Sequence, residues 1–210
     1  MIIAIDGPAG SGKGTLARKI AEALGYAHLD TGKLYRAVGL NVLAVGKDPS
    51  DPDAALESAR ALDSQLLDND ALFGDDAASA ASKVAAIQEV RTVLLEFQRR
   101  FASEPPEGAG GAVLDGRDIG TIVCPDAEVK LFVTASAEVR ADRRHKELLA
   151  RGEASIYARV LQDMKARDER DQSRSVAPLK PALDAMVVDT SELDADAVFK
   201  TAMEIIKARS

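Results

Sequence analysis

The sequence has few cysteines and no long apolar run. Cys124 is the only cysteine among 210 residues, which excludes an internal disulfide framework and a CxxC-type metal site and fits a reducing cytosol. Asp6 ends the first apolar run after four residues, so no signal peptide is expected, and no apolar segment approaches the length that spans a membrane. We therefore expect a cytoplasmic protein without a membrane partner.

An excess of positive charge is also missing. The formal net charge is −7, which argues against a general nucleic-acid binder, so any basic patch must be local and serve a compact anion. With 46% hydrophobic residues, the chain is long enough for one full α/β domain with a small lid or insert. We expect so complete a unit to be a monomer.

A glycine-rich loop follows the first apolar run. Its glycines let the backbone curl so that successive N–H groups point inward. Lys13 adds a positive charge, and the helix expected next turns its N-terminal N–H groups toward the same anion. The sequence therefore predicts an ATP-binding phosphate loop formed by Gly7, Pro8, Ala9, Gly10, Ser11, Gly12, Lys13, Gly14 and Thr15.

The end of this loop departs from the strict G-x-x-x-x-G-K-[ST] pattern. Gly14 stands where that pattern has a hydroxyl, and the hydroxyl comes one residue later, at Thr15. This spacing resembles the small nucleoside-monophosphate kinases more than the GTPases or motor ATPases. Thr15 is the expected Mg²⁺ ligand, directly or through water.

Five short apolar segments alternate with helical patterns. This alternation predicts an α/β fold, with a five-stranded, mostly parallel sheet and helices on both faces. Together with the phosphate loop, it resembles the P-loop kinase fold. The expected strands are residues 2–5, 26–29, 112–114, 129–133 and 186–188. The expected helices run to Leu24 before Gly25, from about 31 to Gly46, over about 53–67, from about Val84 to Phe101, and through 198–206.

An acidic segment separates the second and fourth of these helices. Residues 68–76 are expected to form only a turn-rich link, and the acidic run from Asp51 to Asp76 to be solvated surface rather than a metal site.

The ends of two strands carry further candidate residues. In open α/β sheets ligands lie beyond the carboxyl ends of the strands, so Thr31 and Arg36 are expected near the phosphate loop. Asp115 closes the strand at 112–114 and is expected at the substrate site, where an acidic residue in this position typically holds the Mg²⁺ shell.

Arginines concentrate between residues 136 and 181. One expected helix carries Arg140, Arg143 and Arg144, and the next carries Arg167, Asp171 and Arg174. The spacings of three and four place each set on one helix face. Arg–Asp surface pairing alone is one interpretation. The phosphate loop favours a hinged lid over about 138–174, whose arginines arrive as water leaves and stabilise the transferring phosphoryl group.

In combination, these motifs resemble the bacterial cytidylate kinases. The match runs in order along the whole chain and is carried by residues 5–15, 29–36, 81–85 with Arg91, 115–121, 167–174 and 177–179. The resemblance implies ATP-dependent phosphorylation of CMP and dCMP with Mg²⁺. The family's longer monophosphate-binding insert is brief and Asp-rich here, so we expect a single domain, 1–210, with a reduced monophosphate-binding segment over about 31–102.

The same resemblance implies a role for each site residue. The CMP phosphate would be held by Thr31, Arg36, Arg117 and Arg174, the cytosine edge by Ser82, Arg91 and Asp118, and the sugar hydroxyls by Arg167 and Asp171. Lys13 would bridge the β- and γ-phosphates of ATP, and Arg140, Arg143 and Arg144 would cover the transferring group.

Two other functions stay open at this point. One is a P-loop kinase for another small acceptor, such as UMP, AMP or shikimate, and the other is a nucleotide-binding switch without turnover. Neither histidine is expected to be catalytic: we expect His28 to be packed in a strand and His145 to be solvated on the lid. An acceptor phosphate is already anionic and needs no general base.

Overall fold

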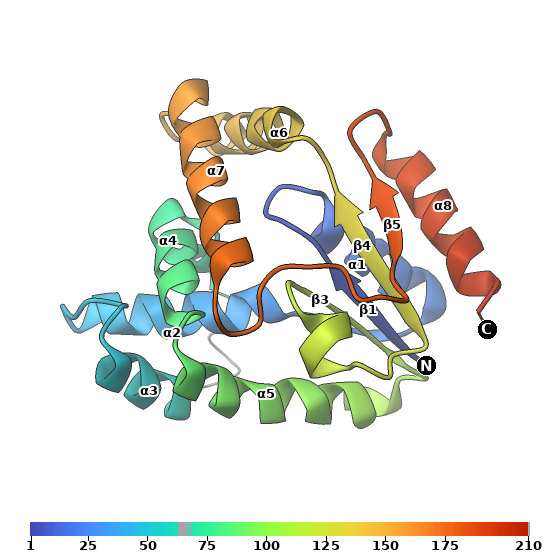
Figure 1. Cartoon of the computed structure of the whole chain (residues 1–210), viewed down its shortest axis with the longest axis horizontal. Coiled ribbons are helices and arrows are strands. Elements are labelled where there is room, and N and C mark those ends of the chain that lie inside the picture. The colour runs from blue at the N-terminus through green and yellow to red at the C-terminus, as the bar shows by residue number, and fades with distance from the viewer. Residues whose placement is uncertain (63–66, 68, 210) are drawn as a thin grey trace.

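The computed structural model describes residues 1–62, 67 and 69–209 and places five strands of this part of the chain in one sheet (Figure 1). The strand order is β2-β3-β1-β4-β5, and all four neighbouring pairs are parallel, so the predicted sheet is confirmed. The strands are β1 (Ile2–Asp6), β2 (Ala27–Asp30), β3 (Ala112–Gly116), β4 (Val129–Thr134) and β5 (Met186–Asp189).

Alternating residues of the strands bury the two faces of the sheet separately. Ile3 and Ile5 of β1 pack on the face covered by α1 (Lys13–Leu24) and α8 (Ala195–Lys207). Ala4 faces the other side, which is covered by α5 (Gln88–Ser103) and by the π-helical turn Ile119–Val123. Gly25 ends α1 with φ 65°, in the left-handed conformation that glycine adopts without strain. Both faces are thus covered, as a parallel sheet requires.

A group of helices packs around a second core beside the sheet, and its first member begins directly after β2. Its members are α2 (Thr31–Ala44), α3 (Pro52–Arg60), α4 (Asp75–Val84) and α5, which share a core around Val38, Val84 and Leu94. Helices α2 and α4 approach closely at Gly39, where an added Cβ would lie 2.6 Å from the Cβ of Ala80. This group forms one wall of the cleft beyond the sheet.

Two further helices, α6 (Ala137–Ala150) and α7 (Tyr157–Ser173), lie beyond the carboxyl ends of the strands, where the sequence predicts a lid (Figure 1). We refer to this helix pair as the lid. They pack on each other through Leu148, Val160 and Met164, and this small core also touches Ala9 of the phosphate loop. The lid is therefore seated on the loop.

The segment between α3 and α5 differs from the sequence prediction. Helix α3 ends at Arg60 and not near Leu67; residues 63–66 of that expected helix lie outside the described part of the chain. The stretch 68–76 was wrongly expected to hold turns alone, because the 3₁₀ helix Asp70–Phe73 and the start of α4 fall within it. Alanines at 77, 80 and 81 favour the helix and allow its close packing on α2.

The expected helix from Val84 to Phe101 is in fact interrupted. Val84 ends α4, Ile87 is the N-cap of α5, and residues 85–87 join the two helices. Apolar residues at spacings of three and four continue across the break because both helices turn them toward one core. The break directs the backbone carbonyl of Ala85 toward the site described next.

Candidate active site

A cavity of about 750 Å³ lies between the sheet, the helices α2 and α4, and the lid. Residues predicted from sequence make up much of its wall: Ala9, Gly10, Gly12, Lys13, Gly14, Thr15, Thr31, Arg36, Ser82, Arg91, Asp115, Arg117, Asp118, Arg143, Arg144, Arg167, Asp171 and Arg174. Four predicted residues do not line it: Gly7, Pro8, Ser11 and Arg140. The tertiary structure thus brings together segments separated by more than a hundred residues.

The phosphate loop owes its shape to glycines. Gly10 and Gly12 have φ values of 73° and 89°, in the left-handed region, and Gly12 is the N-cap of α1. Gly7 has φ 153°, and a Cβ there would lie 2.0 Å from the carbonyl oxygen of Val133. The loop therefore needs glycine for conformation at two positions and for close approach at a third.

The site carries a surplus of positive charge. Burial, with Arg117 nearby, lowers the pKa of Lys13 to about 7, and burial with the neighbouring Arg117 and Arg36 lowers that of Arg167 to about 9. The Nε atom of Arg167 is buried without a hydrogen-bond partner among the described residues. Burying positively charged side chains close together is energetically unfavourable, so their presence here indicates a site for an anionic ligand.

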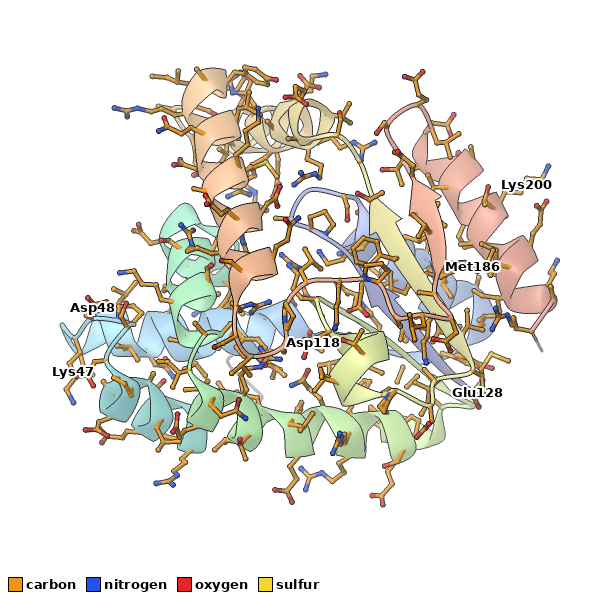
Figure 2. All side chains as sticks on the ribbon, in the orientation of Figure 1. Lys47, Asp48, Asp118, Glu128, Met186 and Lys200 are labelled. Carbon is orange, nitrogen blue, oxygen red and sulfur yellow. The ribbon has the colours of Figure 1, made fainter. Side chains whose placement is uncertain are left out.

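The base-reading candidates lie together in the interior. Arg91 and Asp118 form a buried ion pair, and Arg91 also lies over the ring of Tyr35, 5.5 Å from its centroid. Figure 2 shows Asp118 within the molecule, whereas Lys47 and Lys200 lie at its periphery.

The interruption between α4 and α5 contributes a backbone acceptor. The carbonyl of Ala85 accepts hydrogen bonds from Arg91 Nη1 at 3.3 Å and Arg174 Nη1 at 3.5 Å. The predicted base-reading set and a predicted phosphate ligand therefore meet at one carbonyl.

Aspartates orient two of the arginines that are predicted to hold the acceptor phosphate. Arg117 Nε donates to Asp171 Oδ2 at 3.0 Å, and Arg117 with other cations holds the pKa of Asp171 below its usual range against the opposing effect of burial. Arg36 lies 3.5 Å from the carboxylate of Asp30. Each pair leaves guanidinium N–H groups available to a phosphate, since an arginine has five donors.

Asp115 lies at the end of β3, beside the start of α1. Its Oδ2 contacts His28 Nε2 at 2.9 Å, and its backbone carbonyl accepts a hydrogen bond from Thr31 Oγ1 at 2.8 Å. Its Oδ1 lies 3.8 Å from where a Cβ of Gly14 would stand. A single carboxylate next to Thr15 and the phosphate loop suits Mg²⁺, which usually takes one or two carboxylates together with substrate phosphates and water.

Asp6 joins the phosphate loop to the base-reading segment. Its two carboxylate oxygens accept the backbone N–H groups of Ile119 and Gly120 at 2.7 and 2.8 Å. Burial raises its pKa to about 7, although both hydrogen bonds oppose this.

Sequence reasoning left several residues of this region without a role. Arg170 lines the cavity and donates from Nε to Ser82 Oγ at 3.3 Å, and its place on the arginine-rich face of α7 was a usable signal. Tyr35, Asp6 and Thr190 gave no such signal, because their contacts join distant segments.

The two histidines are held by neighbours. His28 is partly buried in contact with Asp115. The expectation that His145 is solvated was wrong: it is partly buried, with Nδ1 2.8 Å from Ser155 Oγ and its ring edge-on to Tyr157.

A first parallel strand that feeds a phosphate loop, with a lid of two arginine-rich helices facing it, is the architecture of a P-loop kinase acting on small molecules. Comparisons with known proteins identify the family to which this kinase belongs. The cytidylate kinase family profile matches residues 3–208. A cytidylate kinase of Paramagnetospirillum magneticum is 60% identical over 208 residues, 99% of this chain and 98% of its own.

A second relative agrees, the cytidylate kinase of Rhodospirillum rubrum, which is 58% identical over 100% of this chain and 99% of its own. The chain belongs to the cytidylate kinase family and is a phosphotransferase of nucleotide substrates. An uncharacterized protein from Eubacterium ventriosum has a similar fold, with a TM-score of 0.59 at 17% identity over 100% of this chain and 99% of its own. Among the described residues, no helix has the length and apolar character needed to cross a bilayer.

Proposed function

We propose that this chain transfers the γ-phosphoryl group of ATP to CMP and dCMP, forming CDP and dCDP. The observation that carries the proposal is the Arg91–Asp118 ion pair beside Ser82, at the acceptor end of a cavity that begins at the phosphate loop. Cytosine presents a 4-amino donor next to acceptor atoms, which matches a carboxylate beside a guanidinium. Uracil would present a carbonyl to Asp118 instead.

On the donor side, Lys13 and the N–H groups at the start of α1 are proposed to hold the β- and γ-phosphates of ATP. Thr15 and Asp115 are the residues that would hold Mg²⁺, which would neutralise these phosphates. Among the described residues, no three His, Cys, Asp or Glu side chains are grouped as for a metal site made by the protein alone. A cation shared with nucleotide phosphates fits that arrangement.

On the acceptor side, the phosphate of CMP is proposed to lie among Thr31, Arg36, Arg117 and Arg174, with its sugar hydroxyls near Arg167 and Asp171. These side chains would orient an anionic oxygen toward the γ-phosphorus, so position and charge supply the catalysis without a general base. Arg144 lines the cavity from α6 and is proposed to stabilise the charge of the transferring group. One chain supplies all of these groups, so the proposed site needs no second subunit; we further propose that the protein is a monomer that acts in the cytoplasm.

The test is a coupled ADP-release assay with ATP, Mg²⁺ and a panel of CMP, dCMP, UMP, AMP, GMP and shikimate. Turnover with CMP and dCMP far above the others is expected. A preference for another acceptor would retain the phosphate loop and overturn the base-reading assignment. ADP binding without turnover on any acceptor would favour a nucleotide-binding switch.

A further inference from the structure

The outward-facing carbonyl oxygens of the phosphate loop are held by side chains from elsewhere in the chain. A loop that points its N–H groups at an anion must turn carbonyl groups the other way. The carbonyl of Ala9 accepts a hydrogen bond from Arg140 Nη1 at 3.2 Å. The carbonyl of Ser11 accepts from Thr190 Oγ1 at 3.1 Å and from Arg143 Nη1 at 3.4 Å. These donors come from α6 and from the residue that follows β5.

Arg140 is held in this position by several hydrogen bonds. Its Nε donates to Ala135 O at 2.9 Å, and its Nη1 and Nη2 donate to the carboxylate of Asp168 at 3.1 and 2.6 Å. Together with the bond to Ala9, these contacts use four of the five N–H donors of the guanidinium. Arg140 is buried and does not line the cavity. It therefore cannot cover a transferring phosphoryl group from this position.

Thr190 is buried and receives the second guanidinium. Arg143 donates to Thr190 Oγ1 at 2.9 Å and to its carbonyl at 2.7 Å. The hydroxyl of Thr190 has one proton and two acceptors at 3.1 Å, Ser11 O and Thr134 O. Thr134 O already accepts the backbone N–H of Thr190 at 2.8 Å, whereas the other donor to Ser11 O, Arg143 Nη1, is more distant at 3.4 Å. The hydroxyl proton is therefore better used on Ser11 O.

The loop is also packed tightly against these elements. A Cβ at Gly10 would lie 2.9 Å from Met164 Cε and 3.1 Å from both the Cβ and the carbonyl oxygen of Arg140. The hydrogen bonds therefore act on a loop that has little room to relax.

We propose that Arg140, Arg143 and Thr190 form a carbonyl clamp. These positioning residues keep the carbonyl groups of Ala9 and Ser11 turned outward, so that the loop presents its N–H groups to the nucleotide phosphates before any nucleotide arrives. Of the three lid arginines predicted from sequence to cover the transferring group, the clamp uses Arg140 and Arg143; Arg144, which pairs with Glu147 at 3.0 Å and lines the cavity, is the one we assign to that role. The kinetic part of the test rests on the proposed function; the binding part does not.

The first test compares Thr190→Val with Thr190→Ser, using calorimetric titration with ADP. The valine has nearly the same shape and no hydroxyl, so it leaves Ser11 O without its closest donor, and we expect ADP affinity to fall about 2- to 10-fold, the effect of one hydrogen bond. The serine keeps the hydroxyl and should restore most of the affinity. Thr201→Val is the matched control, because the Thr201 hydroxyl donates to the carbonyl of Ala197 within α8 at 3.0 Å. Its ADP affinity should equal that of the wild type.

The second test is Arg140→Lys, which keeps the positive charge and removes the planar guanidinium with its several N–H donors. A clamp predicts a weaker ADP affinity and a higher KM for ATP, with an unchanged KM for CMP. An arginine that touched only the transferring group would lower kcat and leave ADP affinity unchanged.

Two outcomes would overturn the clamp: wild-type ADP affinity in folded Thr190→Val, or a loss confined to kcat in Arg140→Lys. If Thr190→Val does not fold, Arg140→Lys alone decides. If wild-type protein binds ADP but does not phosphorylate CMP, the proposed function is wrong. The clamp can still be tested in that case, because ADP affinity is measured without turnover.

Discussion

The carboxylate of Asp118 and the guanidinium of Arg91 are paired in the interior, and the ring of Tyr35 lies beneath the guanidinium. The carboxylate is complementary to the 4-amino donor of cytosine, and the guanidinium is complementary to the acceptor atoms beside it. The pairing also limits how either side chain can move, because a buried charge that loses its partner is costly. This relationship gives the most direct test of substrate choice.

Asp118→Asn should erode the preference for CMP over UMP. The asparagine amide can donate to the uracil carbonyl, which the carboxylate cannot, so we expect the ratio of kcat/KM values for CMP and UMP to fall about 10- to 100-fold. Steady-state kinetics with both acceptors measures this. Asp126→Asn, at an exposed position after the same helical turn, should leave the ratio unchanged. An unchanged ratio in Asp118→Asn would mean that other groups read the base.

Lys13→Met should abolish most turnover while the protein stays folded. The substitution removes the Lys13 ammonium, which we propose binds the β- and γ-phosphates. We therefore expect kcat to fall about 10²-fold or more. Kinetics and thermal unfolding together test this. The matched control is Lys19→Met, because Lys19 lies on the surface of the same helix α1 and its ammonium pairs with Asp196 of α8. Wild-type kcat in Lys13→Met would refute the role given to the loop.

Nucleotide binding should be accompanied by proton uptake at alkaline pH. The pKa of Lys13 is lowered to about 7, chiefly by burial, and phosphate oxygens beside it favour its charged form. At pH 8 the free side chain is mostly neutral and the bound one charged, so uptake should approach one proton and should diminish toward pH 6.

Calorimetric titrations with ADP in Tris and in HEPES at pH 8 would measure this uptake, since the two buffers differ in ionisation enthalpy. Lys13→Arg serves as the control, because arginine stays charged at both pH values. Equal enthalpies in the two buffers with wild-type protein would show that the Lys13 pKa is not depressed.

Gly39→Ala should destabilise the fold and weaken CMP binding in particular. The new Cβ would lie 2.6 Å from Ala80 Cβ and 2.9 Å from Ala80 C, so α2 and α4 must separate, at a cost of about 1–3 kcal/mol in unfolding free energy. Because α4 carries Ser82, the KM for CMP should rise while the KM for ATP stays near wild type.

Denaturant unfolding and kinetics check the Gly39→Ala prediction against Gly74→Ala. At Gly74, φ is −69° and an added Cβ would make only an ordinary contact at 3.6 Å, so stability should change by less than about 0.5 kcal/mol. Equal stability of the two variants would mean that the helices accommodate the methyl group.

Local patterns in the sequence determined the sheet and the phosphate loop, whereas the residues at the other end of the cavity were expected from the family resemblance. Each strand is a short apolar run ended by glycine, aspartate or a polar turn, and the phosphate loop is contiguous, so its glycine spacing and Lys13 could be recognised without tertiary information. The break at residues 85–87 could not be predicted this way, because α4 and α5 turn their apolar residues toward one core and the apolar spacing continues across the break.

Only the tertiary structure decided what each polar group does within the site. From the sequence, Arg140, Arg143 and Arg144 are equivalent members of one helix face. In the structure, Arg140 donates to Asp168 and to the carbonyl of Ala9, whereas Arg144 lines the cavity. Thr190 joins the phosphate loop across 179 residues of chain. The physical reason is that an arginine or a hydroxyl satisfies whichever acceptors long-range packing brings within about 3 Å, and no local pattern encodes that distance.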